Sequence, residues 1–347
     1  MTTINAMKFS ENEGCMICDE QRGWNPDNLK ILTADKIKPI IFDHIRDRYG
    51  LVACYGNTGT SSWGDEVKFS IKRAIGERYD SELKKRGGET PKDFITIEQI
   101  AEMTYDIICG MKHDHIDQTL LSRYGFTAKD FIRGYYEKGG KRYDLKNSDV
   151  TAEVDGALIW KGRSGEMTPI FLNAGIVAGW EPKDGFRIFA LSLIEFKYEP
   201  VQEIFLCDGS GRDMATVVMT EYLNMKSVPE RRGQIDRVEG LVTAIDAVNA
   251  AVRHDIGCYG YFNIMMFNGK EPVHADKLRT RNGDESKLAM EIVSGMYHGL
   301  VDRDLTHRLV EDLLYKDAKP ETVEEQLFSN TKDLKKLRRF LRGYKIN

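Results

Sequence analysis

Thr2 stands at the start of the sequence with two groups that can act together in chemistry. Once Met1 is removed, Thr2 carries a free α-amine and a side-chain hydroxyl on one residue. The hydroxyl can serve as a nucleophile, and the amine can serve as the base that takes its proton. An α-amine has an ordinary pKa of about 7.7 to 8.0, which suits proton transfer near neutral pH. Methionine aminopeptidases accept a small second residue, so we expect Thr2 to become the first residue.

The segments after Thr2 have the alternation of strands. The sequences INAMKF and GCMICD predict two strands joined by a turn, and the second strand ends at Asp19. The sequences KIKPI and GLVACYG predict two more strands. Helical spacing then begins in DEVKFSIKRAIGERYDSELKK and resumes in TIEQIAEMTYDIICGMK. The first third of the chain therefore predicts a sheet followed by two helices.

The second half repeats this order after a less regular stretch. Residues 113–166 are predicted to be an insertion with a short helix at TAKDFIRGYYEK. Strands follow in TPIFLNAGIVAGW and FRIFALSL, joined by the turn sequence EPKDG, and then in QEIFLCDGSG. A helix over 212–225, an apolar helical stripe over 238–252 and the strand YFNIMMF complete the pattern. The order of sheet, two helices, sheet, two helices and strand suits a four-layer arrangement.

The chain continues for a further 79 residues after this pattern. Helical spacing appears in SKLAMEIVSGMYHGLV, in LTHRLVEDLLYK and in DLKKLRRFLRGYK. The last segment has a basic face, which favours a packed terminal helix with solvated cations over a site for nucleic acid. We therefore predict one domain over residues 1–268, with the insertion, and a helical C-terminal extension over residues 269–347.

Composition and charge exclude several classes of function. The 347 residues carry a net charge of -4, so no overall field attracts nucleic acid or anionic membranes. No apolar run reaches the roughly 20 residues that span a bilayer, and no signal peptide is evident, so we expect a cytoplasmic protein. The six cysteines are expected to be reduced. Cys15 and Cys18 face opposite sides of a strand, and His113 and His115 lack the i, i+4 spacing of helical zinc ligands, so neither a metal nor a cofactor is predicted.

Several separated motifs together resemble one known family. The opening TTI, the segment ADKIKPI, the turn CYGNTG, the sequence DGSG and the segment VRHDIGCYG resemble the proteasome β-subunit and HslV branch of the N-terminal nucleophile (Ntn) hydrolases. The resemblance covers about residues 2–268, apart from the insertion. It implies an α+β fold of the four-layer αββα sandwich type, with the helical C-terminal region appended.

The resemblance also implies roles for particular residues. Thr2 would be the nucleophile, Lys36 would stabilise its alkoxide, and Asp19 would orient Lys36. The main-chain N–H of Gly56 would form the oxyanion hole. Ser210 and Asp255 would hydrogen-bond the N-terminal amine, and Cys258 belongs to the same set of site residues. The chain departs from the family pattern at three positions, because Cys258 replaces a common serine, Arg212 replaces a second serine and Tyr259 replaces a glycine.

Each of these residues also has a plain structural explanation. A threonine near an N-terminus usually has no role, a lysine in a strand usually faces solvent, and an aspartate at a strand end often forms a turn. The GSG sequence is a common turn between a strand and a helix. Their occurrence together, in the family's order, is the feature that indicates a site.

Three functional classes remain open at this stage. The first is an N-terminal threonine hydrolase that acts on a peptide or protein through an acyl-Thr2 intermediate. The second is a catalytically silent, proteasome-like scaffold or ring subunit, because a fold alone does not establish activity. The third is a non-proteolytic amidase or acyl transferase. The resemblance also implies a homo-oligomer, possibly a ring. Hydropathy and net charge predict no membrane partner and disfavour nucleic acid as a partner.

Overall fold

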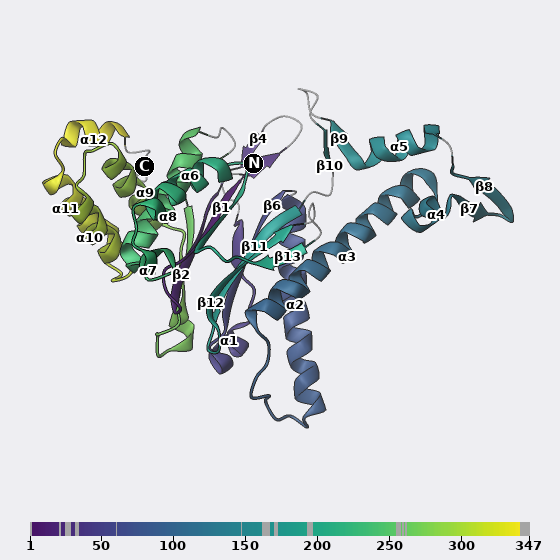
Figure 1. Ribbon diagram of the computed structural model, residues 1–347, viewed down its shortest axis with the longest axis horizontal. Helices are drawn as coiled ribbons and strands as arrows, with labels where there is room; N and C mark the ends of the chain where they lie inside the picture. Colours follow the sequence, from purple (N-terminus) through teal and green to yellow (C-terminus); the bar gives the residue numbers. More distant parts are fainter. Residues whose placement is uncertain are drawn as a thin grey trace.

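The computed structural model describes residues 2–20, 22–24, 29–31, 35–59, 61–146, 148–161, 167–169, 173–192, 197–254, 258, 260 and 262–340. Within these residues, two five-stranded antiparallel sheets face each other, and helices cover the outer surface of each (Figure 1). The predicted mixture of α and β structure is therefore confirmed, and its sheets are antiparallel.

The first sheet has the strand order β14-β1-β2-β15-β16. Its strands are β1 (Thr3–Lys8), β2 (Glu13–Asp19), β14 (Phe205–Gly209), β15 (Phe262–Asn268) and β16 (Leu278–Arg281). In β2 the side chain of Cys15 packs under the helices, whereas that of Cys18 packs between the sheets. These two thiols thus lie on opposite faces, as predicted. Burial raises the pKa of the Cys18 thiol to about 12, so it stays protonated at neutral pH.

The second sheet has the strand order β13-β12-β11-β6-β5. Its strands are β5 (Ile37–Pro39), β6 (Val52–Gly59), β11 (Asn173–Glu181), β12 (Gly185–Ser192) and β13 (Lys197–Pro200). The predicted turn at EPKDG closes the hairpin of β11 and β12, where Glu181 pairs with Gly185. Gly185 has a φ of 71°, a conformation that glycine adopts without strain.

Apolar side chains from both sheets fill the space between them. Alternation along each strand turns every second residue toward this shared core. The core includes Ile4, Ala6, Met16, Cys18, Ile37, Val52, Cys54, Ile176, Ala178, Phe186, Ile188 and Met265. The sheets pack closely at Gly14, where a Cβ atom would lie 2.4 Å from the ring of Phe186. A larger residue at position 14 would therefore displace this ring and separate the sheets.

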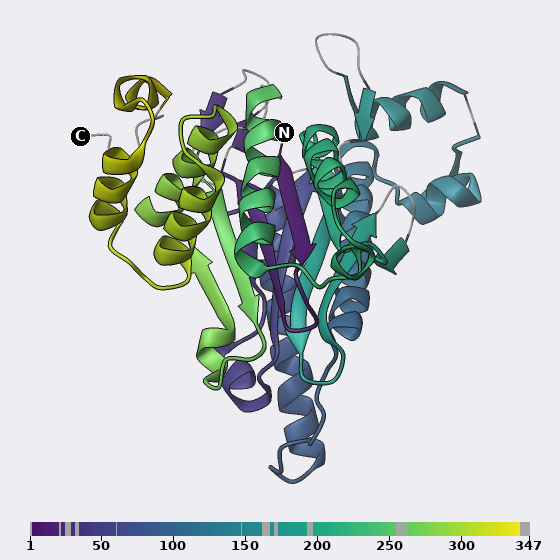
Figure 2. The ribbon, with the colours of Figure 1, turned by 60° about the vertical axis from the view of Figure 1, so that its left-hand side comes forward.

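Helices from the second half of the chain cover the first sheet (Figure 2). They are α6 (Arg212–Asn224), α7 (Val228–Arg231), α8 (Arg237–His254), α9 (Asp284–Tyr297), α10 (Arg303–Leu314), α11 (Pro320–Asn330) and α12 (Leu334–Phe340), with the short helix η1 (His274–Lys277) before β16. The predicted apolar stripe of α8 is buried. The C-terminal helices α9 to α12 pack into the same hydrophobic core as β1, β2 and α8.

Long helices from the first half cover the second sheet. They are α2 (Ser61–Lys85) and α3 (Ile97–Tyr124), with α1 (Asp43–Tyr49) beside them. Helix α3 begins at a capping box formed by Thr96 and Gln99 and ends at Gly125 in the left-handed conformation. The prediction that this helix ends near His113 is therefore wrong. His113 and His115 lie within α3, and His115 Nε2 is 3.6 Å from Glu66 Oε2.

The predicted insertion forms an arm that extends away from the two sheets (Figure 1). It contains α4 (Ala128–Arg133), β7 (Tyr135–Lys138), β8 (Lys141–Asp144), α5 (Ser148–Leu158) and β9 (Ile159–Lys161), and β9 pairs with β10 (Met167–Pro169), which lies just after its predicted end. A separate hairpin near the N-terminus consists of β3 (Arg22–Trp24) and β4 (Leu29–Ile31). The predicted helix at 127–138 is half right, because its second half is β7. Leu120, Phe126, Leu145 and Val154 form a small core of the arm.

Candidate functional site

The ends of β1 and β2 bring Thr2 and Asp19 together. The register of this hairpin pairs Ile4 with Cys18, so the residues just before Ile4 lie beside Asp19. The main-chain N–H of Thr3 donates to Asp19 Oδ1 over 2.9 Å. The Asp19 side chain is fully buried. The first residue before β1 is therefore held next to a buried carboxylate.

Lys36 reaches the same carboxylate from the second sheet. It directly precedes β5, and its Nζ lies 2.6 Å from Asp19 Oδ1. Only 7% of the Lys36 side chain is exposed. A single oxygen of Asp19 thus accepts from the Lys36 ammonium and from the N–H of Thr3. Buried charges need partners and hydrogen bonds to persist, and this pair has both.

Ser210 lies on the other side of Thr2. The main-chain N–H of Thr2 donates to Ser210 Oγ over 3.2 Å, and the N–H of Gly211 donates to the Thr2 carbonyl oxygen over 3.3 Å. Ser210 Oγ also lies 4.0 Å from Cys258 Sγ, which is buried behind it. Cleavage of the bond before Thr2 would turn this N–H into an amine that already has a hydroxyl partner.

The first glycine of the DGSG sequence, Gly209, is required by its backbone conformation and by its closeness to Thr2. Gly209 has a φ of 96°, and a Cβ atom there would lie 2.1 Å from the Thr2 carbonyl oxygen. Only glycine allows this conformation and this close approach together. Gly209 therefore lets the end of β14 pass directly beside Thr2, which places Ser210 against the Thr2 nitrogen.

Gly56 lies within β6 and is buried between the sheets. It pairs with Ile37 of β5 and with Ile176 of β11, so it is fixed by the strand that follows Lys36. A Cβ atom at Gly56 would lie 2.7 Å from Ile37 Cγ2 and 2.7 Å from Met16 Cε. The site therefore needs glycine at this position for packing, whatever the role of its N–H.

Replacement of Gly56 by alanine is expected to destabilise the protein by about 1 to 3 kcal/mol, because the added methyl group has no space between the sheets. Urea denaturation measures the change. Gly110 in α3 is the matched control, because nothing lies within 4 Å of its Cβ direction. Gly110→Ala is expected to be neutral or stabilising by up to about 1 kcal/mol. Equal effects of the two substitutions would show that Gly56 is not closely packed.

Asp255 falls outside the described residues, as does Tyr259. The structure thus brings together Thr2, Asp19, Lys36, Ser210 and Cys258, with Gly56 in the adjoining strand. Arg212 begins α6, and its side chain is exposed beside Asp213.

Two contacts near the site were not predicted from the sequence. Thr58 Oγ1 of β6 donates to Asp208 Oδ2 of β14 over 2.8 Å, which joins the two sheets two residues before Ser210. Lys68 of α2 is 6% exposed, and its Nζ donates to the Asp35 carbonyl oxygen over 2.7 Å. The only sequence signal for Lys68 is its position next to Val67 in the buried stripe of α2. Both contacts fix segments adjoining predicted site residues.

Burial lowers the pKa of Lys68 to about 8, despite the nearby Asp65 carboxylate. Between pH 8 and 10.5 the unfolded chain keeps this proton while the folded chain releases it, so stability rises with pH in that window. Relative to Lys68→Met, the natural chain is expected to gain about 3 kcal/mol between these pH values. Urea denaturation of both chains at several pH values measures this difference. Parallel stability curves would contradict a lowered pKa at Lys68.

No group of three or more histidine, cysteine, aspartate or glutamate side chains in the described ranges is arranged to hold a metal ion. In the same part of the chain, none of the helices has the length and apolar character needed to cross a bilayer.

Comparison with known proteins adds no assignment. No protein-family model matches the sequence, and no curated protein matches it with significant similarity. The contacts around Thr2 therefore carry the functional argument.

Proposed function

We propose that this protein is an Ntn hydrolase that cleaves peptide or related amide bonds through an acyl-Thr2 intermediate. The proposal includes the four-layer αββα sandwich of the proteasome-like family. One observation carries it: the buried Asp19 carboxylate joins the Lys36 ammonium to the main chain of the residue after Thr2. A buried ion pair is a weak source of stability, so its place beside a potential nucleophile favours a role in chemistry.

The proposed reaction begins when the bond before Thr2 is cleaved. The Thr2 hydroxyl attacks the substrate carbonyl carbon, and its proton passes to the Thr2 amine, directly or through water. Lys36 stabilises the developing alkoxide, and Asp19 holds the ammonium in place. The Gly56 N–H would stabilise the oxyanion of the tetrahedral intermediate. Loss of the substrate's amine with a proton gives the acyl ester, which water hydrolyses to a carboxylic acid and free Thr2.

Ser210 has a defined part in this scheme. Its hydroxyl oxygen accepts from the Thr2 nitrogen. The N–H of the next residue, Gly211, donates to the Thr2 carbonyl oxygen, which also lies 3.5 Å from Ser210 Oγ. It would orient the lone pair of the amine toward the hydroxyl. In the family pattern Asp255 and Cys258 would complete the set of groups around the amine.

Covalent labelling tests the proposal. The chain is produced with Thr2 as its first residue, by cleavage of a removable N-terminal fusion, and is treated with a peptide epoxyketone or a β-lactone. Intact mass is expected to show one adduct, and peptide mapping is expected to place it on Thr2. The same chain with Met1 retained, and a Thr2→Ala chain, serve as controls and are expected to remain unmodified.

Two results would count against the proposal. Absence of both labelling and hydrolysis across a peptide library would favour the silent scaffold. An adduct elsewhere, equal in the Thr2→Ala chain, would remove Thr2 as the nucleophile. Labelling of Thr2 without cleavage of peptides would instead direct the search to small amides and acyl acceptors.

The proposal also includes assembly into a homo-oligomer. Large apolar side chains are exposed along α6 and the segment that follows it, and they are Met214, Val217, Met225 and Val228. Exposed apolar patches of this kind often mark protein contacts. Mass photometry of the purified chain measures the assembly, and Val217→Glu is expected to weaken it. A monomer at micromolar concentration would contradict this part of the proposal.

A further inference from the structure

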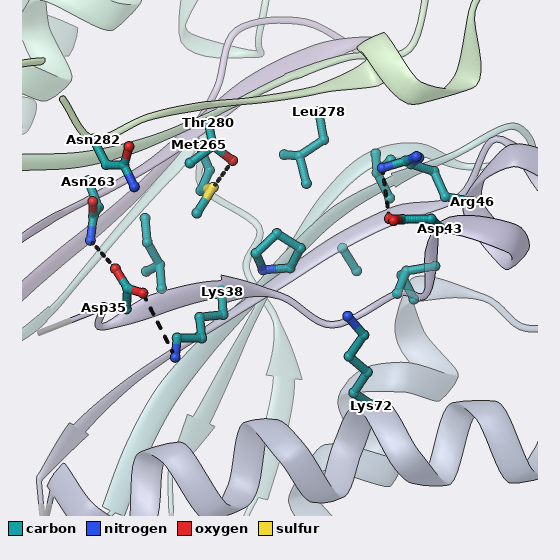
Figure 3. Close-up of a pocket in the computed structure, with 15 residues that line it drawn as sticks. Asp35, Lys38, Asp43, Arg46, Lys72, Asn263, Met265, Leu278, Thr280 and Asn282 are labelled. Atoms are coloured by element: carbon teal, nitrogen blue, oxygen red, sulfur yellow. Dashed lines mark hydrogen bonds and ion pairs between the residues drawn. The ribbon is translucent and has the colours of Figure 1, made fainter. Parts of the chain in front are cut away.

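A pocket lies beside the edge strands of the two sheets. It has a volume of about 420 Å³, within the usual range of small-molecule sites. Strands β5, β6, β15 and β16 and helices α1 and α2 contribute its walls. Figure 3 shows Asp35 and Asn263 at one end of this pocket, and Lys72 and Arg46 at the other.

The Asn263 end of the pocket contains a buried acceptor that needs a donor. Asn263 is 2% exposed, and its Nδ2 donates to Asp35 Oδ1 over 3.3 Å. An ionised carboxylate can only accept, so this bond fixes which atom of the amide is nitrogen. Asn263 Oδ1 is buried and has no donor among the described residues. Buried polar atoms without partners are uncommon and costly, so this atom indicates a missing donor.

Asp35 makes this end of the pocket suitable for a cationic donor. The Asp35 carboxylate lies 3.9 Å from Lys38 Nζ, which is long for an ion pair. The Asp35 side chain is 59% exposed. An ammonium placed between Asn263 Oδ1 and the Asp35 carboxylate would satisfy the buried acceptor and gain a charge-assisted bond. The same end of the pocket is next to the proposed catalytic site in the chain, because Asp35 directly precedes Lys36.

The other end of the pocket carries positive charge. Lys72 of α2 is half-buried, and its Nζ lies 4.8 Å from the centre of the Phe42 ring. No carboxylate in the described part of the chain lies within 4 Å of Lys72 Nζ, whereas Arg46 is paired with Asp43 and Asp47. Lys72 is therefore the cation that remains available to an anionic group.

The wall between the two ends is mainly apolar. It includes Ile37, Pro39, Ile41, Val52, Met265 and Leu278. Such a wall favours a ligand with apolar substituents between its charged ends, because apolar surface is then removed from water.

We propose that this pocket binds a short peptide with free ends. Its N-terminal ammonium would lie between Asn263 Oδ1 and Asp35, its C-terminal carboxylate would meet Lys72, and its side chains would contact the apolar wall. The pocket's size suits a dipeptide. This inference is independent of chemistry at Thr2, because none of these pocket residues takes part in the proposed reaction.

Calorimetric titration of the Thr2→Ala chain with leucylleucine tests this inference, because that variant cannot turn the peptide over. One peptide is expected to bind per chain. Acetylation of the peptide's amine, or amidation of its carboxylate, is expected to weaken binding by about tenfold or more, because each removes one charged contact. Lys72→Met and Asp35→Asn are expected to weaken it to the same degree. The matched control is Arg73→Met, which changes an exposed cation on the same helix beside Glu77 and is expected to leave affinity unchanged.

Three outcomes would overturn the inference. They are no binding of leucylleucine, equal binding of the free and capped peptides, and unchanged affinity in both Lys72→Met and Asp35→Asn. Any of these would show that the pocket is not a site for a short peptide with free ends. Each outcome is distinct from failure at Thr2, since labelling of Thr2 is measured separately.

Discussion

Thr2→Ala is expected to lower kcat/KM for amide cleavage by at least about 10⁴-fold in the chain that begins at residue 2, since removal of a catalytic nucleophile has effects of this size. The methyl side chain of alanine cannot form the acyl ester, although the amine and Lys36 remain. The measurement is cleavage of a fluorogenic peptide selected from a library. Circular dichroism is expected to be unchanged, because Thr2 lies before β1 and outside the sheets.

A second variant separates the hydroxyl from the shape of the side chain. Thr2→Ser keeps the hydroxyl and the amine, so it is expected to remain active and to be labelled by the epoxyketone. Activity in Thr2→Ala equal to that of the natural chain would refute Thr2 as the nucleophile. Loss of activity in Thr2→Ser as well as in Thr2→Ala would show that the hydroxyl alone is insufficient and that the threonine methyl group helps to position it.

Lys36→Met is expected to destabilise the protein by about 3 to 5 kcal/mol, because it leaves the Asp19 carboxylate buried without its cation. Urea denaturation measures this loss. The double variant Lys36→Met with Asp19→Asn is expected to recover much of it, since the asparagine carries no charge and can still accept from the Thr3 N–H. Both variants are expected to lack amide cleavage, because neither has an ammonium beside Thr2.

The control for this series is an exposed ion pair. Lys85 Nζ lies 2.8 Å from Glu82 Oε1 at the end of α2, where the Lys85 side chain is 67% exposed and that of Glu82 is 29% exposed. Lys85→Met is expected to leave the urea midpoint unchanged. If the double variant were active, the Lys36 ammonium would have no catalytic part and the ion pair would be structural only.

Local patterns predict those elements whose signals lie within one segment. The alternation in β1, β2 and β6, the helical stripe of α8 and the turn at EPKDG are all of this kind, and the structure contains each. Asp19 and Ser210 contact the start of the chain, and Lys36 contacts Asp19, whereas the roles that the family resemblance implies for these residues stay predictions.

Other features depend on contacts that no local pattern shows. Helix α3 continues beyond His113 because its later turns support the arm. The core of the arm packs Leu120 and Phe126 against Leu145 and Val154, which lie about 20 to 35 residues further along the chain. Strand β16 is short and forms by pairing with β15. Helix α11 had a usable signal that was missed, because Pro320 opens it and Val323 and Leu327 have i, i+4 spacing. The bond between Thr58 and Asp208 requires both sheets to be in place.

The hydrogen bonds that hold the start of β1 determine whether the chain can fold before the bond preceding Thr2 is cleaved. Chain ends are usually poorly ordered. Here the Thr3 N–H donates to Asp19, and the Thr2 carbonyl oxygen accepts from the N–H of Gly211. Neither the Thr3 nitrogen nor the Thr2 carbonyl oxygen belongs to the peptide bond before Thr2, so cleavage of that bond leaves both hydrogen bonds intact. Folding therefore does not require that bond to be broken first, and under the proposed function removal of Met1 would leave a terminal residue that is already held in place.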